Sequence, residues 1–258
     1  MQAVVVLLLK IAGAAAAGII AGSGVIYAVN HMPASWLAPY GEDPCRDAVS
    51  NDRQRVSGYP WKYVSSAVFC IVFIFTASRE TLQYAVPAAA ALFILALMAI
   101  CCGKYRVVPD QLTVLLFVCG FGFVPFHSTW KMSVIGAAAG LLAMALVFII
   151  VKYALKRDTG SAIYNDEYGY LPGRHRDASV KAPLMGAGEI PVGAAIGLMA
   201  GPYGALAAVA CGACASAVVT LFLTRTGRDR KGDAQPLTTY ICAAAALYIA
   251  RHIRVFGF

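Results

Sequence analysis

Long apolar stretches, separated by shorter polar segments, recur along the whole chain. A helix needs about 20 mostly apolar residues to cross the hydrocarbon core of a bilayer. Eight stretches are candidates. The second, fourth and sixth are short, so either their ends extend into flanking polar residues or the helices are partly shielded from lipid. The pattern predicts helices at about Ala3 to Val29, Tyr63 to Ala77, Tyr84 to Cys102, Gln111 to Phe126, Ser133 to Leu155, Glu189 to Gly201, Tyr203 to Thr224 and Leu237 to Ile253.

The composition agrees with this pattern. Hydrophobic residues make up 60% of the 258 residues and charged residues only 13%, whereas an ordinary soluble domain carries about 25% charged residues. An ordinary soluble domain is therefore excluded, and the lipid bilayer is the predicted environment. We predict an all-α fold, a polytopic integral membrane protein of about eight transmembrane helices that forms one domain over residues 1–258.

The placement of charge predicts the orientation. Lys and Arg accumulate in the cytoplasmic loops of membrane proteins. If the N-terminus lies outside, the segments after the first, third, fifth and seventh predicted helices face the cytoplasm, and they hold most of the 21 Lys and Arg residues. A basic face beside anionic lipid accounts for the net charge of +8. No nucleic-acid partner is predicted.

Two of the predicted cytoplasmic segments are long, residues 30–62 and residues 156–188, and the second leads directly into a glycine-rich motif. Of the eight cysteines, only Cys45 lies in a long loop, and the others lie in or at the ends of predicted helices. Small buried thiols are common packing residues, so the pattern predicts no disulfide framework. The histidines lie near different helix ends, and no shared metal site is expected.

The run from Gly186 to Glu189 places a carboxylate at the start of the sixth apolar stretch. Ionisable groups at the edge of hydrocarbon are costly, and by default they indicate a functional site. Gly186 and Gly188 indicate close approach of the backbone to another group. Glu189 is therefore the first candidate for chemistry in this chain.

Four further motifs accompany Gly186 to Gly201: Gly22-Ser23 with Met32-Pro33, Tyr59-Pro60, Val108-Pro109-Asp110-Gln111-Leu112-Thr113, and Pro236-Leu237. In type and order, the five resemble the motifs of the type IV prepilin peptidases, membrane aspartic proteases that cut the leader from pilin and pseudopilin precursors. The segment around Asp110 is close to that family's Ile-Pro-Asp-x-Leu-Thr. The run from Gly186 is similar to Gly-x-Gly-Asp and the helix that follows it.

The resemblance implies a catalytic pair of aspartates. One corresponds to Glu189, which keeps the carboxylate and adds a methylene. The other falls on Cys102, which has no carboxylate. Two close carboxylates share a proton, so that one acts as a base toward water while the other donates to the substrate carbonyl. The pair is thus altered in this chain at both positions.

The resemblance also implies a place and a partner. It places the chain in the bacterial inner membrane, with the site facing the cytoplasm, in type IV pilus assembly or protein secretion. The partner is the N-terminal segment of a pilin or pseudopilin precursor. A dyad mechanism needs no cofactor and no metal. Bifunctional members carry paired Cys-x-x-Cys sets of zinc-site type in the first cytoplasmic loop. Because only Cys45 is present, neither zinc nor methyltransferase activity is expected.

Three interpretations of the altered pair remain open. In the first, Glu189 and Asp110 form a non-standard dyad of an aspartic endopeptidase. A straight third helix would put Asp110 about 12 Å beyond Cys102, so this dyad requires a turn near Gly103, which Pro109 favours. A thiol mechanism at Cys102 belongs to the same interpretation.

In the second interpretation, the peptidase scaffold persists without proteolysis and binds a pilin-like helix or an assembly partner. In the third, the chain is a small membrane transporter, and Glu189 and Lys10 act as intramembrane charges. The sequence does not indicate an oligomeric state.

Overall fold

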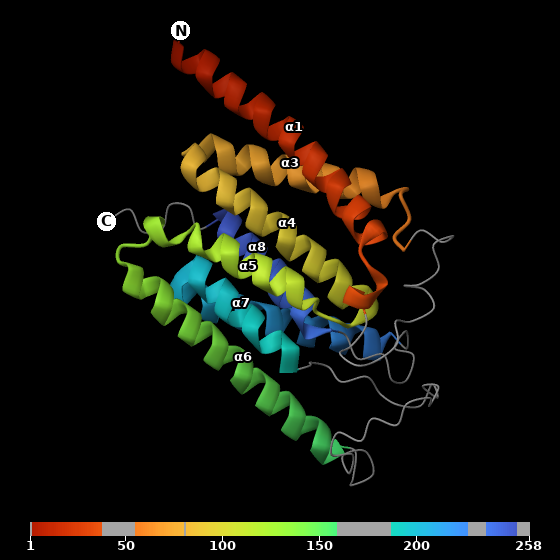
Figure 1. Cartoon of the computed structure of the whole chain (residues 1–258). Coiled ribbons are helices and arrows are strands. Elements are labelled where there is room, and N and C mark those ends of the chain that lie inside the picture. Colours follow the sequence, from red (N-terminus) through yellow and green to blue (C-terminus); the bar gives the residue numbers. More distant parts are fainter. Residues whose placement is uncertain (1, 38–54, 80, 159–186, 227–235, 252–258) are drawn as a thin grey trace.

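The computed structural model describes residues 2–37, 55–79, 81–158, 187–226 and 236–251, and within these ranges it is helical and has no strand (Figure 1). The predicted all-α fold is confirmed. The α-helices of the described residues are α1 (Gln2–His31), α3 (Trp61–Arg79), α4 (Leu82–Tyr105), α5 (Asp110–Phe121), α6 (Trp130–Asp158), α7 (Ile190–Arg225) and α8 (Leu237–Arg251).

Apolar length identifies the helices that can cross a membrane. The described residues contain five such spans, and the predicted number of about eight crossings stays a prediction. Two shorter apolar helical regions, Asp110–Phe126 and Leu237–Arg251, accompany them. The five spans are Val4–His31, Trp61–Ser78, Gln83–Tyr105, Trp130–Tyr153 and Ile190–Leu223.

α7 consists of two helical halves that fold back on each other. At Gly201 the backbone leaves the helix, with φ 69° and ψ −178°, and Pro202 follows. A Cβ placed on Gly140 of α6 would lie 2.0 Å from Gly193 O and 3.4 Å from Ala205 Cβ. In a straight helix these two residues would be about 18 Å apart. The chain therefore reverses at Gly201, and the sixth and seventh predicted helices correspond to residues 190–200 and 202–225.

The turn inside α7 has a specific hydrogen bond. In a continuous helix, the carbonyl of Leu198 would accept from the N–H of residue 202, but Pro202 has no N–H. Nε2 of His127 lies 3.3 Å from Leu198 O instead. In the tautomer that carries its hydrogen on Nε2, His127 donates to this carbonyl and satisfies it. A buried carbonyl without a partner is costly, so His127 stabilises the end of the first half of α7.

Paired glycines hold α6 against the first half of α7. A Cβ on Gly136 would lie 2.2 Å from Gly197 O, and a Cβ on Gly193 would lie 2.4 Å from Gly140 O. Each helix thus presents two glycines, four residues apart, to the backbone of the other. Small residues at this spacing allow helices to approach closely in lipid, where packing replaces the hydrophobic effect as the driving force.

Glycines also allow close contact between the backbones of α1 and α3. A Cβ on Gly18 would lie 2.5 Å from Cys70 Cα, and a Cβ on Gly22 would lie 2.4 Å from Ser66 Cα. This proximity allows a hydrogen bond between the two helices: Ser65 Oγ of α3 donates to Gly22 O of α1 at 2.8 Å. The N-terminal part of α1 extends beyond this contact (Figure 1).

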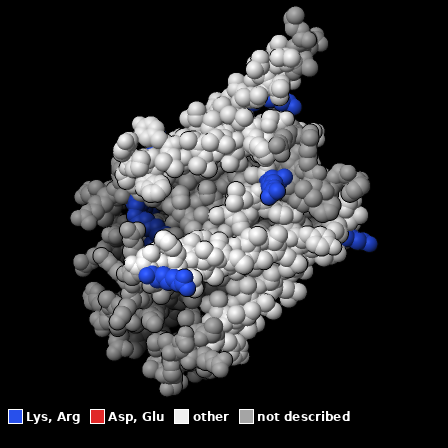
Figure 2. All heavy atoms as spheres, turned by 180° about the vertical axis from the view of Figure 1, so that it is seen from behind, with Lys and Arg blue, Asp and Glu red and all other residues white. Residues whose placement is uncertain are grey.

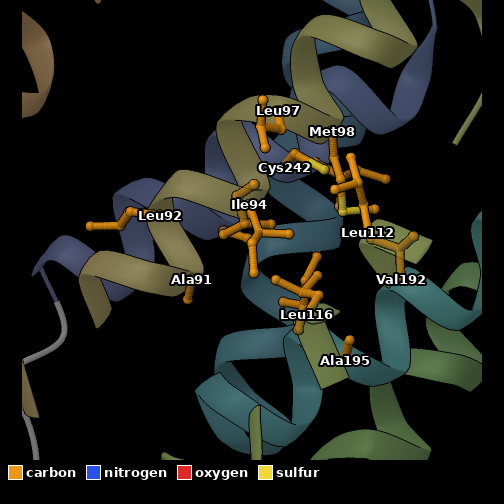
Figure 3. Packing of buried hydrophobic residues seen from close by; sticks show 14 of the residues in the cluster. Ala91, Leu92, Ile94, Leu97, Met98, Leu112, Leu116, Val192, Ala195 and Cys242 are labelled. Atoms are coloured by element: carbon orange, nitrogen blue, oxygen red, sulfur yellow. The ribbon is translucent and has the colours of Figure 1, made fainter. Parts of the chain in front are cut away.

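α4 passes through the hydrophobic core between these pairs. Met98 of α4, Leu116 of α5 and Ile241 of α8 are fully buried. Figure 3 shows Leu97 and Met98 of α4 beside Cys242 of α8, with Leu112 of α5 below them. Val192, near the start of α7, belongs to the same cluster, so the core brings α4, α5, α7 and α8 together.

We expect Gly136→Val to lower the free energy of unfolding by about 1–3 kcal/mol, because its side chain overpacks a contact between two backbones. Thermal unfolding in detergent, followed by circular dichroism, measures the change. Gly13→Val is the matched control, since no atom lies within 4 Å of a Cβ on Gly13. Equal unfolding midpoints for the two variants would contradict the glycine contact.

Candidate functional site

The end of α4 carries Cys102, which is 2% exposed. The helix continues through Gly103 to Tyr105 and ends at Arg106, whose left-handed conformation (φ 58°, ψ 30°) directs its N–H to Cys102 O. The chain then folds back, so that Cys102 Sγ lies 3.7 Å from Val107 O. The turn that the sequence predicts near Gly103 is therefore present, but it lies at Arg106, three residues later.

Glu189 lies at the start of α7, as the last residue of a short 3₁₀ helix, Ala187–Glu189. Its side chain is 9% exposed. Thr238, in the first turn of α8, is fully buried and donates a hydrogen bond from Oγ1 to Glu189 Oε2. The contact joins residues 49 positions apart. α8 thus supplies a donor that holds one oxygen of the Glu189 carboxylate.

Two thiols lie near the same carboxylate. Cys102 of α4 and Cys242 of α8 both lie close enough to Glu189 for its charge to act on them, and Cys242 is fully buried. Three helices therefore converge at Glu189. α4 contributes the thiol of Cys102 to the surroundings of this carboxylate.

Pro109 and Asp110 begin α5. Pro109 is buried and extended (φ −66°, ψ 125°), which ends the turn after α4, and Asp110 is the exposed first residue of the helix. α5 starts beside the Cys102 end of the site. It runs toward the other end of α7's first half, where a Cβ on Gly120 would meet Leu198 Cδ2 at 2.7 Å. Asp110 and Glu189 therefore lie at the same end of a parallel helix pair.

Of the two glycines in the motif, the structure describes Gly188 and not Gly186. Gly186 lies outside the described residues, as do Cys45 and most of the two long segments. Gly188 is exposed, and no described atom lies within 4 Å of a Cβ placed on it. Packing of the described residues gives no reason for a glycine there.

Two basic residues, Arg55 and Lys104, lie near the same end of the molecule. Nη1 of Arg55 donates to Val29 O at 3.1 Å and to Met32 O, at the end of α1. Nζ of Lys104, near the end of α4, donates to the carbonyl of Arg55. These bonds fasten the end of α1 to the end of α4. On the face shown in Figure 2, the charged residues of the described part of the chain are basic.

The described residues contain no group of three or more His, Cys, Asp or Glu side chains that could hold a metal ion. The chemistry that they offer is that of carboxylates, thiols and a threonine hydroxyl. Glu189 is the carboxylate that the surrounding helices bury, and Asp110 is the exposed carboxylate at the same end.

Fold and site together define an all-helical membrane protein with a buried carboxylate where three helices meet. Comparison with protein-family models matches residues 89–224, more than half of the chain, to the type IV leader peptidase family. The chain belongs to this family. The matched region includes Cys102, Asp110 and Glu189. No curated protein and no solved structure matches the chain.

Sequence reasoning missed three residues that the structure connects to this region. Thr238 and Cys242 contact or neighbour Glu189, and His127 supports the turn in α7. A threonine at the start of a helix and a cysteine within one are common, so neither is a signal by itself. For His127 the sequence did contain a signal. Pro202 has no N–H, so the carbonyl of Leu198 needs another donor.

We expect Thr238→Val to lower the free energy of unfolding by about 1–3 kcal/mol, because it removes a donor from a buried carboxylate. Thr238→Ser keeps the hydroxyl and is the matched control, expected to retain most of the stability. Thermal unfolding in detergent at neutral pH compares the three proteins. Equal losses in both variants would show that the methyl group, and not the hydrogen bond, matters.

Proposed function

We propose that this protein is a membrane endopeptidase that removes the leader from pilin or pseudopilin precursors. The observation that carries the proposal is the placement of two carboxylates, Glu189 and Asp110, at the same end of the α5 and α7 pair. Membership of the type IV leader peptidase family supports the class of substrate. The basic predicted cytoplasmic segments support an orientation with this end at the cytoplasmic face, and a bacterial inner-membrane location is part of the proposal.

Hydrolysis of a peptide bond needs a base and an acid. Water attacks the scissile carbonyl carbon, one carboxylate takes a proton from the water, and the other carboxyl group donates a proton to the carbonyl oxygen. The tetrahedral intermediate then collapses: the carboxyl group that took the water proton gives it to the amine nitrogen, the C–N bond breaks, and the other carboxylate takes back a proton from a hydroxyl of the intermediate, which leaves the carboxylic acid product. The two carboxyl groups titrate as a unit.

The exposures of the two side chains favour a division of roles. Asp110 is exposed, and it has direct access to the water that becomes the nucleophile. Glu189 is buried and accepts a hydrogen bond from Thr238, which suits it to hold the proton that is donated to the substrate carbonyl. Packed helices lie about 8–10 Å apart, axis to axis. The proposed arrangement requires one peptide carbonyl and one water to fit between the two side chains.

We expect Glu189→Gln and Asp110→Asn each to lower leader removal by about 100-fold or more, because each removes a proton-transfer group. Coexpression with a cognate pilin precursor, scored by gel shift, measures cleavage. Gln111→Ala is the control, since Gln111 is an exposed neighbour of Asp110. Cleavage that survives both carboxylate substitutions would overturn the dyad.

A second candidate function is a scaffold that binds the precursor, or an assembly partner, without cutting it. One observation favours it. Where α4 meets Glu189, the side chain is the thiol of Cys102, and a thiol cannot act as the second carboxylate of an aspartic dyad. In this case the wild-type chain retains the precursor on copurification and leaves its leader in place.

If the chain is a scaffold, we expect Cys102→Asp to create leader removal, because it places a carboxylate beside Glu189. The gain should reach about 100-fold over the wild-type background, the usual scale of acid–base catalysis. Cys102→Asn has the same shape without the carboxylate and should give no gain. Cleavage by both variants, or by neither while both bind the precursor, would contradict this account of Cys102.

A further inference from the structure

Thr238 connects α8 to the candidate site. Its hydroxyl donates to Glu189 Oε2, and its side chain is fully buried. Cys242, four residues further along α8, lies near the same carboxylate. Residues four apart lie on the same face of a helix, so one face of the start of α8 is turned toward Glu189. The carboxylate therefore lies beside the first turn of α8.

The start of α8 is held against two other helices. Thr239 Oγ1 donates to Ala99 O of α4 at 3.3 Å. A Cβ placed on Gly212, in the second half of α7, would lie 2.6 Å from Ile241 Cα, so the two backbones are in contact there. Both contacts lie within three residues of Thr238. The hydroxyl of Thr238 is therefore fixed in place by the packing of α8 against α4 and α7.

A fixed donor matters to Glu189 because a glutamate side chain is flexible. Rotation about its side-chain bonds gives the carboxyl group several staggered positions, and selecting one of them costs conformational entropy. Misplacing a reacting group by about 1 Å can lower a rate by about 100-fold. A hydrogen bond from a buried hydroxyl selects one orientation before the substrate binds, which is how supporting residues preorganise a catalytic group.

We infer that Thr238 is a positioning residue of the peptidase, and that it sets the side-chain length that position 189 requires. The inference rests on the proposed function, and Thr238 acts through Glu189 rather than on the substrate. An aspartate at position 189 would be shorter by one C–C bond, about 1.5 Å. Hydrogen bonds between oxygens span only about 2.5–3.0 Å. From the same backbone position, the shorter side chain therefore falls short of the Thr238 hydroxyl.

Steady-state cleavage of a pilin precursor tests the role of Thr238. We expect Thr238→Val to lower kcat by about tenfold and to leave KM nearly unchanged, because the carboxyl group is misplaced while the surface that binds the precursor is intact. Thr238→Ser keeps the hydroxyl and should retain most of the wild-type kcat.

Thr239→Val is the matched control, because the hydroxyl of Thr239 lies in the same turn of α8 but donates to Ala99 O of α4. All variants are assayed below their unfolding midpoints, so that a loss of stability does not lower the measured rate. Thr239→Val should then have the wild-type kcat. Equal kcat values for Thr238→Val and Thr239→Val would overturn the inference.

A double-mutant cycle tests whether Thr238 acts through the length of Glu189. We expect Glu189→Asp to lower kcat by about tenfold or more, although it keeps the carboxyl group, because that group is withdrawn from Thr238. Thr238→Val should then cause little further loss in the Glu189→Asp background. Losses that multiply in the double variant, or a wild-type kcat for Glu189→Asp, would contradict the inference.

The outcomes separate this inference from the proposed function. If the wild-type protein cuts the precursor and Thr238→Val cuts it equally fast, the role of Thr238 is overturned and the peptidase proposal stands. If the wild-type protein does not cut the precursor, the proposed function is overturned, and the inference with it.

Discussion

The close contact between α6 and the first half of α7 sets the position of the candidate site. Gly136 and Gly140 face Gly197 and Gly193, and the backbones meet with no side chain between them. In lipid, contact of this kind holds helices together. Because Glu189 immediately precedes α7, its place beside α4 and α8 depends on this contact. His127 completes the arrangement by satisfying the carbonyl that Pro202 leaves without a donor.

The helices could be predicted because the length of an apolar run is a local property. Each of the eight stretches overlaps a described helix, although the fourth runs past the end of α5 and the eighth extends beyond the described residues. Even the boundary at Gly201 was visible in the chain, because glycine and proline together interrupt a helix. The turn after α4 was harder to place. It lies at Arg106, although the left-handed conformation there usually belongs to glycine or asparagine, so the sequence pointed to Gly103 instead.

The surroundings of Glu189 could be predicted only in part. A carboxylate at the edge of hydrocarbon indicates a site wherever it occurs, so Glu189 itself was a clear candidate. Thr238 and Cys242 were not, because their relation to Glu189 depends on how α8 packs against α4 and α7. Asp110 and Glu189 lie at the same end of the bundle because α5 runs parallel to the first half of α7, and this arrangement also depends on packing between distant segments. Such contacts between distant segments have no local signature.

The thiol at Cys102 changes the energetics of the site. Two carboxylates buried together oppose each other's ionisation, whereas a buried thiol behaves as a small hydrophobic group. One buried carboxylate with a hydroxyl donor is therefore easier to stabilise than a buried pair. The second carboxylate of the proposed dyad, Asp110, is exposed and needs no such support. In the proposed function, a bound precursor brings its scissile bond between the two carboxylates. Substrate binding, rather than the empty fold, then completes the catalytic arrangement.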